Sequence, residues 1–252
     1  MRTFLFLTLC LFANISFSQG QIDVLLKQAD NFDKQLKETE AMDKYKEVLA
    51  AEPTNFKALM RLTELNAAIG SRQLKNKEKL PYFQQALDYA NTAYSSVDTG
   101  SADAYYLLAL TAWKMSIVEE NNKEEAAWLK KWRESAERAI KQNENHAKAT
   151  FLLGKWHFEM TKASVLKKAA VKTVYTGLGK WDIETATKLF EKAKTLDQYF
   201  VQNFYECAKA YEYNNQPTQQ IETLQRLVKL PNRTADDAAW KAEGKKMLGQ
   251  MK

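Results

Sequence analysis

Residues 185–198, TATKLFEKAKTLDQ, carry a pattern that few folds can accommodate. Ala186, Phe190 and Ala193 lie at i, i+4 and i+7, so one face of a helix presents a small, a large and a small side chain. A second helix can approach closely at the alanines, while the phenylalanine ring fills the space between the two helices. We therefore predict a helix whose packing partner is another helix of the same chain.

The same spacing recurs along the chain, which indicates a repeat. Copies of the pattern are found at Ala41, Tyr45 and Val48 and at Ala86, Ala90 and Ala93. A period of about 34 residues with this signature in the second of two helices is typical of the tetratricopeptide repeat, whose unit is a pair of antiparallel helices.

The chain is poor in residues that form turns, with 8 Gly and 4 Pro among 252 residues, which favours an almost entirely helical protein. We predict an all-α, tetratricopeptide-like right-handed solenoid of about five degenerate helix pairs. The final segment, TADDAAWKAEGKKMLGQMK, is predicted to form a C-terminal capping helix, because such arrays need a cover on their exposed end.

The first residues read as a signal peptide, 1–18, with one basic residue, a short apolar run and small residues before the cleavage point. Lipidation at Cys10 and an uncleaved membrane anchor remain alternatives. Residues 19–252 are expected to form a single domain with long insertions near 71–81 and 162–182. Cys207 would be the one cysteine of the mature chain, so no internal disulfide is expected in this periplasmic or secreted protein.

Several blocks in the second half of the chain occur in a specific order: FLLGKWHFEM, SVLKKAAVKTVYTG, TATKLFEKAKTLDQYF and LPNRTADD. Through these blocks residues 55–248 resemble the regulator of microtubule dynamics family of tetratricopeptide-like proteins. The chain departs from the family where prolines are common, namely at Glu144, Gln198, Gly177 and Gly179. The resemblance implies a helical-repeat fold and a scaffolding role, in a family linked to microtubules or membrane contacts, and it supplies no catalytic residues. Because export would separate the chain from microtubules, only the fold is carried over.

In a tetratricopeptide solenoid the first helix of each pair lines the concave surface. Counting along the repeats predicts a partner-binding surface formed by Tyr105, Lys148, Phe151, Lys155, Tyr205 and Lys209, with Arg61 adjacent. Lys155 and Lys209 take the same position in successive repeats, so two ammonium groups would stack in an aromatic groove suited to an acidic or carboxylate-ended peptide. The alternative is that these lysines only keep a solvated face soluble.

The stretch 162–180 contains five lysines and no acidic residue. Four of the lysines form its candidate contact surface for an anionic membrane or an acidic partner: Lys162, Lys167, Lys168 and Lys172. The alternative is an extended hairpin whose apolar residues pack back on the solenoid. A peripheral membrane or lipid-binding protein is therefore the second functional hypothesis.

No catalytic or metal-binding pattern stands out in the sequence. His146 and His157 are separated by three helical turns, roughly 16 Å at 1.5 Å per residue, too far apart to share a metal. Cys207 lies at a core position, where an inert thiol is expected. We predict a non-catalytic protein-interaction scaffold without a cofactor, whose partner is a protein or peptide. A net charge of +6 is too small to indicate nucleic acid, and the oligomeric state stays open.

Overall fold

The computed structural model describes residues 19–97, 101–174 and 180–251, so the expected signal peptide lies outside the described residues. All regular secondary structure within these ranges is helical. The helices are α1 (Gln19–Lys34), α2 (Glu38–Ala51), α3 (Phe56–Arg72), α4 (Asn76–Ser95), α5 (Ala102–Val118), α6 (Asn122–Gln142), α7 (Ala147–Lys162), α8 (Val165–Val174), α9 (Ile183–Leu196), α10 (Val201–Tyr213), α11 (Pro217–Leu227) and α12 (Asp237–Gln250).

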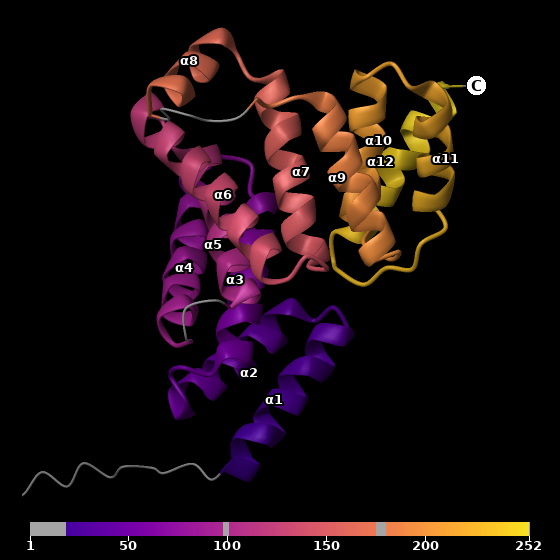
Figure 1. Ribbon diagram of the computed structural model, residues 1–252. Coiled ribbons are helices and arrows are strands. Elements are labelled where there is room, and N and C mark those ends of the chain that lie inside the picture. The colour runs from indigo at the N-terminus through magenta and orange to yellow at the C-terminus, as the bar shows by residue number, and fades with distance from the viewer. Residues whose placement is uncertain (1–18, 98–100, 175–179, 252) are drawn as a thin grey trace, which may run out of the picture.

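The helices pack as antiparallel pairs that follow one another in a curved row (Figure 1). The pairs are α1 with α2, α3 with α4, α5 with α6, α7 with α9 and α10 with α11. α12 packs against both α10 and α11 and covers the last pair. The predicted solenoid of five pairs with a capping helix is therefore confirmed.

Side chains at the helix starts explain where several of these helices begin. The side chain of Asn55 accepts a hydrogen bond from the backbone N–H of Ala58 at 3.0 Å, and Ser101 accepts from Ala104 at 3.2 Å. These side chains satisfy N–H groups that have no partner within the first turn of a helix. The first helices of the second and third pairs thus each begin directly after a residue whose side chain caps the helix.

The fourth pair is built around the small, large, small pattern of residues 185–198. Ala186, Phe190 and Ala193 in α9 are all fully buried. The facing residue in α7 is Gly154, where an added Cβ would lie 3.1 Å from the Phe190 ring. The small residue on α7 and the alanines on α9 thus let the two backbones approach closely, as predicted.

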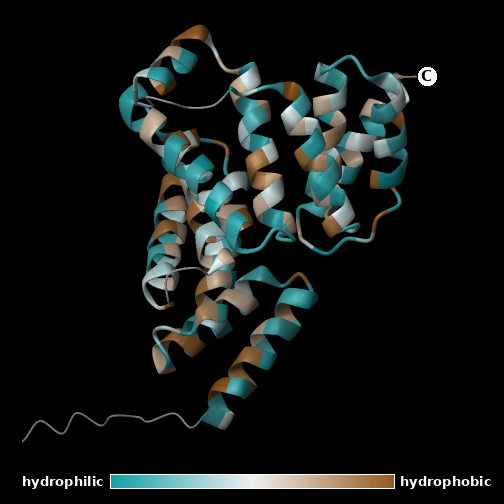
Figure 2. Ribbon diagram, viewed as in Figure 1, coloured by the Kyte–Doolittle hydropathy of each residue, from teal (hydrophilic) through white to brown (hydrophobic). Residues whose placement is uncertain are grey.

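The two expected insertions take different forms. In the region 71–81, α3 continues to Arg72 and α4 begins at Asn76, so most of this stretch extends the two helices. Pro81 lies inside α4. In the region 162–182, the short helix α8 packs against α6. Figure 2 shows hydrophobic colour on the outer part of α8, at the edge of the molecule.

None of the helices in the described ranges is long and apolar enough to cross a membrane.

Gly70 permits the close approach of α3 and α4. An added Cβ would lie 2.6 Å from the ring of Phe83 and 2.8 Å from the Cβ of Tyr82. We expect Gly70→Ala to lower the free energy of unfolding by about 1–3 kcal/mol, because the fully buried Phe83 ring would have to move. Gly249→Ala is the control: no atom lies within 4 Å of its added Cβ, so chemical denaturation should show no loss there.

Candidate functional site

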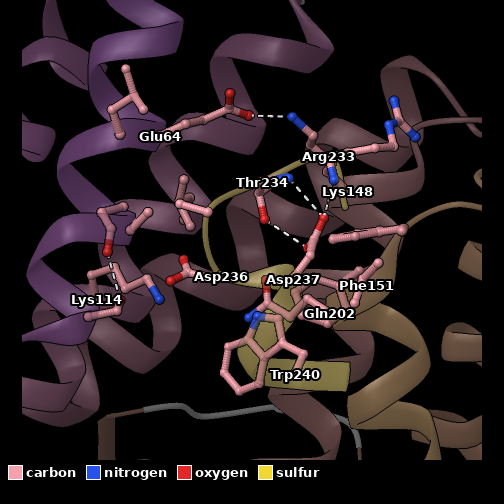
Figure 3. Close-up of a pocket in the computed structure, with 18 of the residues that line it drawn as sticks. Glu64, Lys114, Lys148, Phe151, Gln202, Arg233, Thr234, Asp236, Asp237 and Trp240 are labelled. Atoms are coloured by element: carbon pink, nitrogen blue, oxygen red, sulfur yellow. Dashed lines mark hydrogen bonds and ion pairs between the residues drawn. The ribbon is translucent and has the colours of Figure 1, made fainter. Parts of the chain in front are cut away.

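The concave side of the solenoid encloses a cavity of about 540 Å³. Most of its wall is formed by α3, α5, α7, α10 and the chain between α11 and α12, and α1, α2, α4 and α12 contribute the remaining helical residues. Apolar side chains such as Phe83, Leu110, Trp113, Phe151 and Trp240 form part of the wall, and charged groups from all five pairs lie among them. Figure 3 shows Phe151 and Trp240 together with the charged residues Glu64, Lys114 and Lys148. A cavity of this size and composition is typical of a ligand-binding site.

The segment 231–236, which we call the C-terminal strap, lines the cavity and joins the capping region of the solenoid to the second helix pair. Asp236 in the strap pairs with Arg72 of α3 at 2.9 Å, and Arg72 also binds Glu38 of α2. Asp237, the first residue of α12, accepts hydrogen bonds from the backbone N–H groups of Arg233 at 2.6 Å and Thr234 at 2.8 Å. The strap is therefore held to α3 by its last residue and to the start of α12 by two of its middle residues.

Glu64 is the centre of an ion-pair network at one end of the cavity. Its carboxylate accepts hydrogen bonds from Lys148 at 2.6 Å and from Tyr106 at 2.9 Å, and it pairs with Arg61 (Figure 3). Burial alone would raise the pKa of Glu64, but the charges of Lys148 and Arg61 hold it at about 2. Arg61 also binds Asp33 of α1 at 2.7 Å. Arg61 and Lys148 are thus already paired.

The structure differs from the expectation of two free ammonium groups at Lys155 and Lys209. Lys155 is 6% exposed, and its Nζ lies 2.8 Å from Glu159 and 2.9 Å from Glu206. Lys209 also contacts Glu206, at 3.3 Å. Burial would lower the pKa of Lys155, but the two carboxylates raise it. The two lysines neutralise one buried acid, Glu206, because the same repeat position that brings them together also brings this acid.

The aromatic residues of the predicted surface are distributed over three places. Phe151 is buried in the cavity wall, with its ring 4.9 Å from that of Phe200. The ring of Tyr205 packs against that of Trp240 of the capping helix in a tilted arrangement, with the ring centres 5.0 Å apart. Tyr105 does not reach the cavity: it lines a second hollow of about 380 Å³ between α4, α5 and α6. The structure therefore brings Arg61, Lys148 and Phe151 together at one cavity and separates Tyr105 from them.

Lys114 is a cavity residue that the repeat positions do not predict. It is 6% exposed, its Nζ lies 3.5 Å from the centre of the Trp113 ring, and no carboxylate of the described residues lies within 4.0 Å of it. Burial lowers the pKa of Lys114 to about 7, and the nearby charge of Lys155 adds to this effect. The sequence feature that could have indicated Lys114 as a site residue is its position as a lysine inside an otherwise apolar helix, AYYLLALTAWKMSIV.

The basic stretch after α7 is partly engaged within the fold. Lys167 pairs with Glu125 of α6 at 2.5 Å, and Lys168 donates to the carbonyl of Thr161 at 2.9 Å. Lys162 lies 3.7 Å from Glu159, and Lys172 lies 5.9 Å from the centre of the Trp181 ring. The lysines of α8 therefore help to attach the helix to the solenoid.

The remaining chemically reactive side chains are buried outside the cavity. The pKa of the Cys207 thiol is raised to about 12 by burial, and the pKa of His157 is lowered to about 4, again chiefly by burial. In the part of the chain that the structure describes, no three His, Cys, Asp or Glu side chains are arranged to hold a metal ion. The cavity itself is therefore lined by charged and apolar side chains, and these two reactive groups are not among them.

Replacing the buried lysine should stabilise the protein. The Lys114 amine carries a proton more readily in the unfolded chain, so its burial is fully unfavourable below pH 7 and becomes less so as the pH rises toward 10. We expect Lys114→Met to raise the free energy of unfolding by about 1–3 kcal/mol at pH 6.5 and by less at pH 9, measured by urea denaturation. Lys79→Met, on the same wall but half-buried, should stay within about 0.5 kcal/mol.

Breaking the strap's ion pair should loosen the strap more than it destabilises the fold. Arg72 and Asp236 keep 35% and 24% of their side chains exposed, so Arg72→Ala should cost about 0.5–1 kcal/mol. Amide hydrogen exchange at Arg233 and Thr234 should become two- to fivefold faster. Lys44→Ala, which breaks the exposed Lys44–Glu47 pair on α2, should leave this exchange unchanged. Equal exchange in both variants would show that Arg72 does not hold the strap.

A family model described as regulator of microtubule dynamics protein 1-3 matches residues 25–252. The chain is also similar to the structure of TTC0263, a thermophilic TPR protein of Thermus thermophilus: 12% identity, a TM-score of 0.65, and coverage of 89% of this chain and 99% of that chain. PilW, a type IV pilus biogenesis factor, has 15% identity, a TM-score of 0.48, and coverage of 93% and 90%. No curated protein sequence matches significantly. The likeness to TTC0263 shows the tetratricopeptide fold.

Proposed function

Because this chain belongs to the regulator of microtubule dynamics protein 1-3 family and has the tetratricopeptide fold, we propose that it is a scaffold that binds a segment of another protein. The observation that carries this proposal is the 540 Å³ cavity on the concave side, to which all five helix pairs contribute. Concave surfaces of helical solenoids are extended binding surfaces. Binding rather than catalysis fits a wall whose acids and bases are mostly paired with one another.

The same proposal includes export, with residues 1–18 removed as a signal peptide and residues 19–252 acting as one domain. For that reason the microtubule partner in the family name is not extended to this chain. Mass spectrometry of the protein purified from its source would give the mature N-terminus. An N-terminus near Gln19 is expected, and a protein that keeps Met1 would contradict cleavage.

A variant that fills the cavity tests the binding proposal. Ala68 lines the cavity, and Ala68→Trp would place an indole ring in the space that a bound segment needs. Ala50 is exposed on α2 and does not line the cavity, so Ala50→Trp is the matched control. The probe is an array of twelve-residue peptides with both ends blocked, scored for binding of wild type and both variants.

We expect a set of array peptides that binds wild type and Ala50→Trp equally and binds Ala68→Trp at least tenfold more weakly. Thermal melts of the three proteins show whether each is folded before the array is read. If no peptide distinguishes Ala68→Trp from Ala50→Trp, the cavity is not the peptide-binding surface.

A second function, contact with an anionic membrane, is favoured by one observation on α8. Val165 and Leu166 in its first turn are 83% and 80% exposed, and Lys162 and Lys172 nearby are also exposed. Exposed apolar residues beside lysines are typical of a helix that lies in the membrane interface. The engagement of Lys167 and Lys168 within the fold leaves fewer cations for this role, so we rank it second.

Vesicle sedimentation tests the membrane hypothesis. Wild type should sediment with vesicles containing phosphatidylglycerol at low salt and remain in solution with phosphatidylcholine alone. Leu166→Asp should abolish sedimentation, whereas Leu74→Asp should not, since Leu74 is even more exposed than Leu166 but lies between α3 and α4. Absence of sedimentation at low salt would exclude the membrane function.

A further inference from the structure

Around the cavity, the acidic side chains all have donors within the described part of the chain. Arg61 and Lys148 bind Glu64, Arg72 binds Glu38 and Asp236, Arg233 binds Asp197, Lys155 and Lys209 bind Glu206, Arg61 binds Asp33, and Thr234 with two backbone N–H groups binds Asp237. These pairs leave no acid of the wall in need of a cationic ligand.

The buried cation Lys114 is the exception in this arrangement. It lines the cavity, it is 6% exposed, and its ammonium lies against the Trp113 ring rather than an acid. Leu110 and Ile117, one turn before and after it on α5, are apolar lining residues. A buried ammonium in such surroundings is unfavourable unless an anion or another acceptor joins it. The cavity therefore has a place for one negative charge beside an apolar wall.

We propose that Lys114 binds the C-terminal carboxylate of a peptide whose last side chain is apolar and fills the cavity beside it. This inference rests on the proposed peptide-binding function and names the part of the peptide that enters. A chain end supplies one carboxylate next to one side chain, which matches one buried ammonium that has no acid partner and lies beside apolar residues. A peptide with several acids would find Arg61, Lys148 and Arg233 already paired, and among the lining cations of the described residues only the half-buried Lys79 also lacks an ion pair.

Two further groups on the wall suit the main chain of such a peptide. The side-chain amide of Gln202 on α10 and the indole N–H of Trp240 on α12 line the cavity without a hydrogen bond to the rest of the described chain. Figure 3 shows Trp240 and Gln202 on the side of the cavity formed by the later helices, across from α5 with Lys114. Donors on the wall opposite the ammonium can bind the peptide's carbonyl groups.

The charged groups that face Lys114 come from several elements. Lys155 of α7 and Lys79 of α4 disfavour its protonated form, whereas Asp236 and Glu206 favour it. Both acids are themselves bound to other cations, so they compensate Lys114 only in part. A ligand carboxylate would favour protonation, and binding should therefore weaken as the pH rises above about 7.

The test compares peptides that differ only at the C-terminal group. The probes are fluorescein-labelled hexapeptide pools that end in Leu, Ile, Phe or Trp, each prepared with a free carboxylate and as the amide. Fluorescence anisotropy gives the affinity of wild type, Lys114→Met, Lys114→Gln and Ala68→Trp. For wild type we expect the free-acid pools to bind at least tenfold more tightly than the amides at pH 7, with a smaller difference at pH 9.

Lys114→Met and Lys114→Gln should each remove this preference while leaving amide binding within about twofold, and Ala68→Trp should weaken both kinds of pool. Equal binding of acid and amide to wild type, lost in Ala68→Trp, would overturn the carboxylate inference and leave the proposed function standing. No binding of any pool would overturn the inference as well, and the blocked-peptide array then decides the proposed function separately.

Discussion

Phe190→Ala is expected to lower the free energy of unfolding by about 3–5 kcal/mol. The ring is fully buried between α7 and α9, 5.9 Å from the ring of Phe151 and 6.4 Å from that of Phe158. Its removal loses the transfer free energy of the ring and leaves a cavity that the facing Gly154 cannot fill. Urea denaturation followed by circular dichroism measures the change, and thermal denaturation should show a decrease of roughly 8–15 °C in Tm.

Two variants on the same helix set the scale of this effect. Phe190→Leu keeps most of the volume and should lose less than about 1.5 kcal/mol. Lys188→Ala changes an exposed residue two positions away and should stay within about 0.5 kcal/mol. A loss below about 1 kcal/mol for Phe190→Ala would mean that α7 and α9 can close the gap, contrary to the close packing described for this pair.

The second large effect is expected at the buried acid Glu206. Glu206→Ala should lower the free energy of unfolding by about 2–4 kcal/mol, because Lys155 would keep one of its two acids and remain buried. The value lies below the full penalty for an unpaired buried charge, since Glu159 still contacts the ammonium at 2.8 Å. Denaturation at pH 7 measures the loss.

The double variant Lys155→Met/Glu206→Leu shows whether Glu206→Ala lowers stability because Lys155 loses an ion-pair partner or because packed side-chain atoms are lost. Two apolar side chains of similar size should bring stability to within about 1 kcal/mol of wild type, since both charges are removed together. If the double variant were as unstable as Glu206→Ala, the attraction between Lys155 and Glu206 would exceed the cost of burying their charges, and the ion pair would stabilise the fold.

Most of the fold could be predicted from the sequence because the repeat signature is a local property. The sizes of Ala186, Phe190 and Ala193 determine how closely two neighbouring helices pack, and this distance determines where the next helix pair of the array lies. The form of the region 71–81 could not be predicted, because polar residues suit a loop and an exposed helix equally well. Pro81 lies in α4 despite its usual role near helix starts.

The candidate site could be predicted only in part, because it depends on how far the row of helices curves. Repeat positions indicate the concave face, and Arg61, Lys148 and Phe151 do line the cavity. They do not reveal which charges meet across it. Glu206 pairs with Lys155 from a different helix, and Lys114 is left without an acid, because of distances between helices that no local pattern encodes.

The strap also changes how the array should unfold. In an open solenoid each repeat contacts only its neighbours, so stability is close to a sum over adjacent pairs and the ends can fray independently. Here the link between Asp236 and Arg72 spans 164 residues and joins the capping region to the second pair. A contact of this kind adds a non-neighbour coupling, so loosening at one end is transmitted to the other. The array should therefore unfold more cooperatively than its repeat number alone implies.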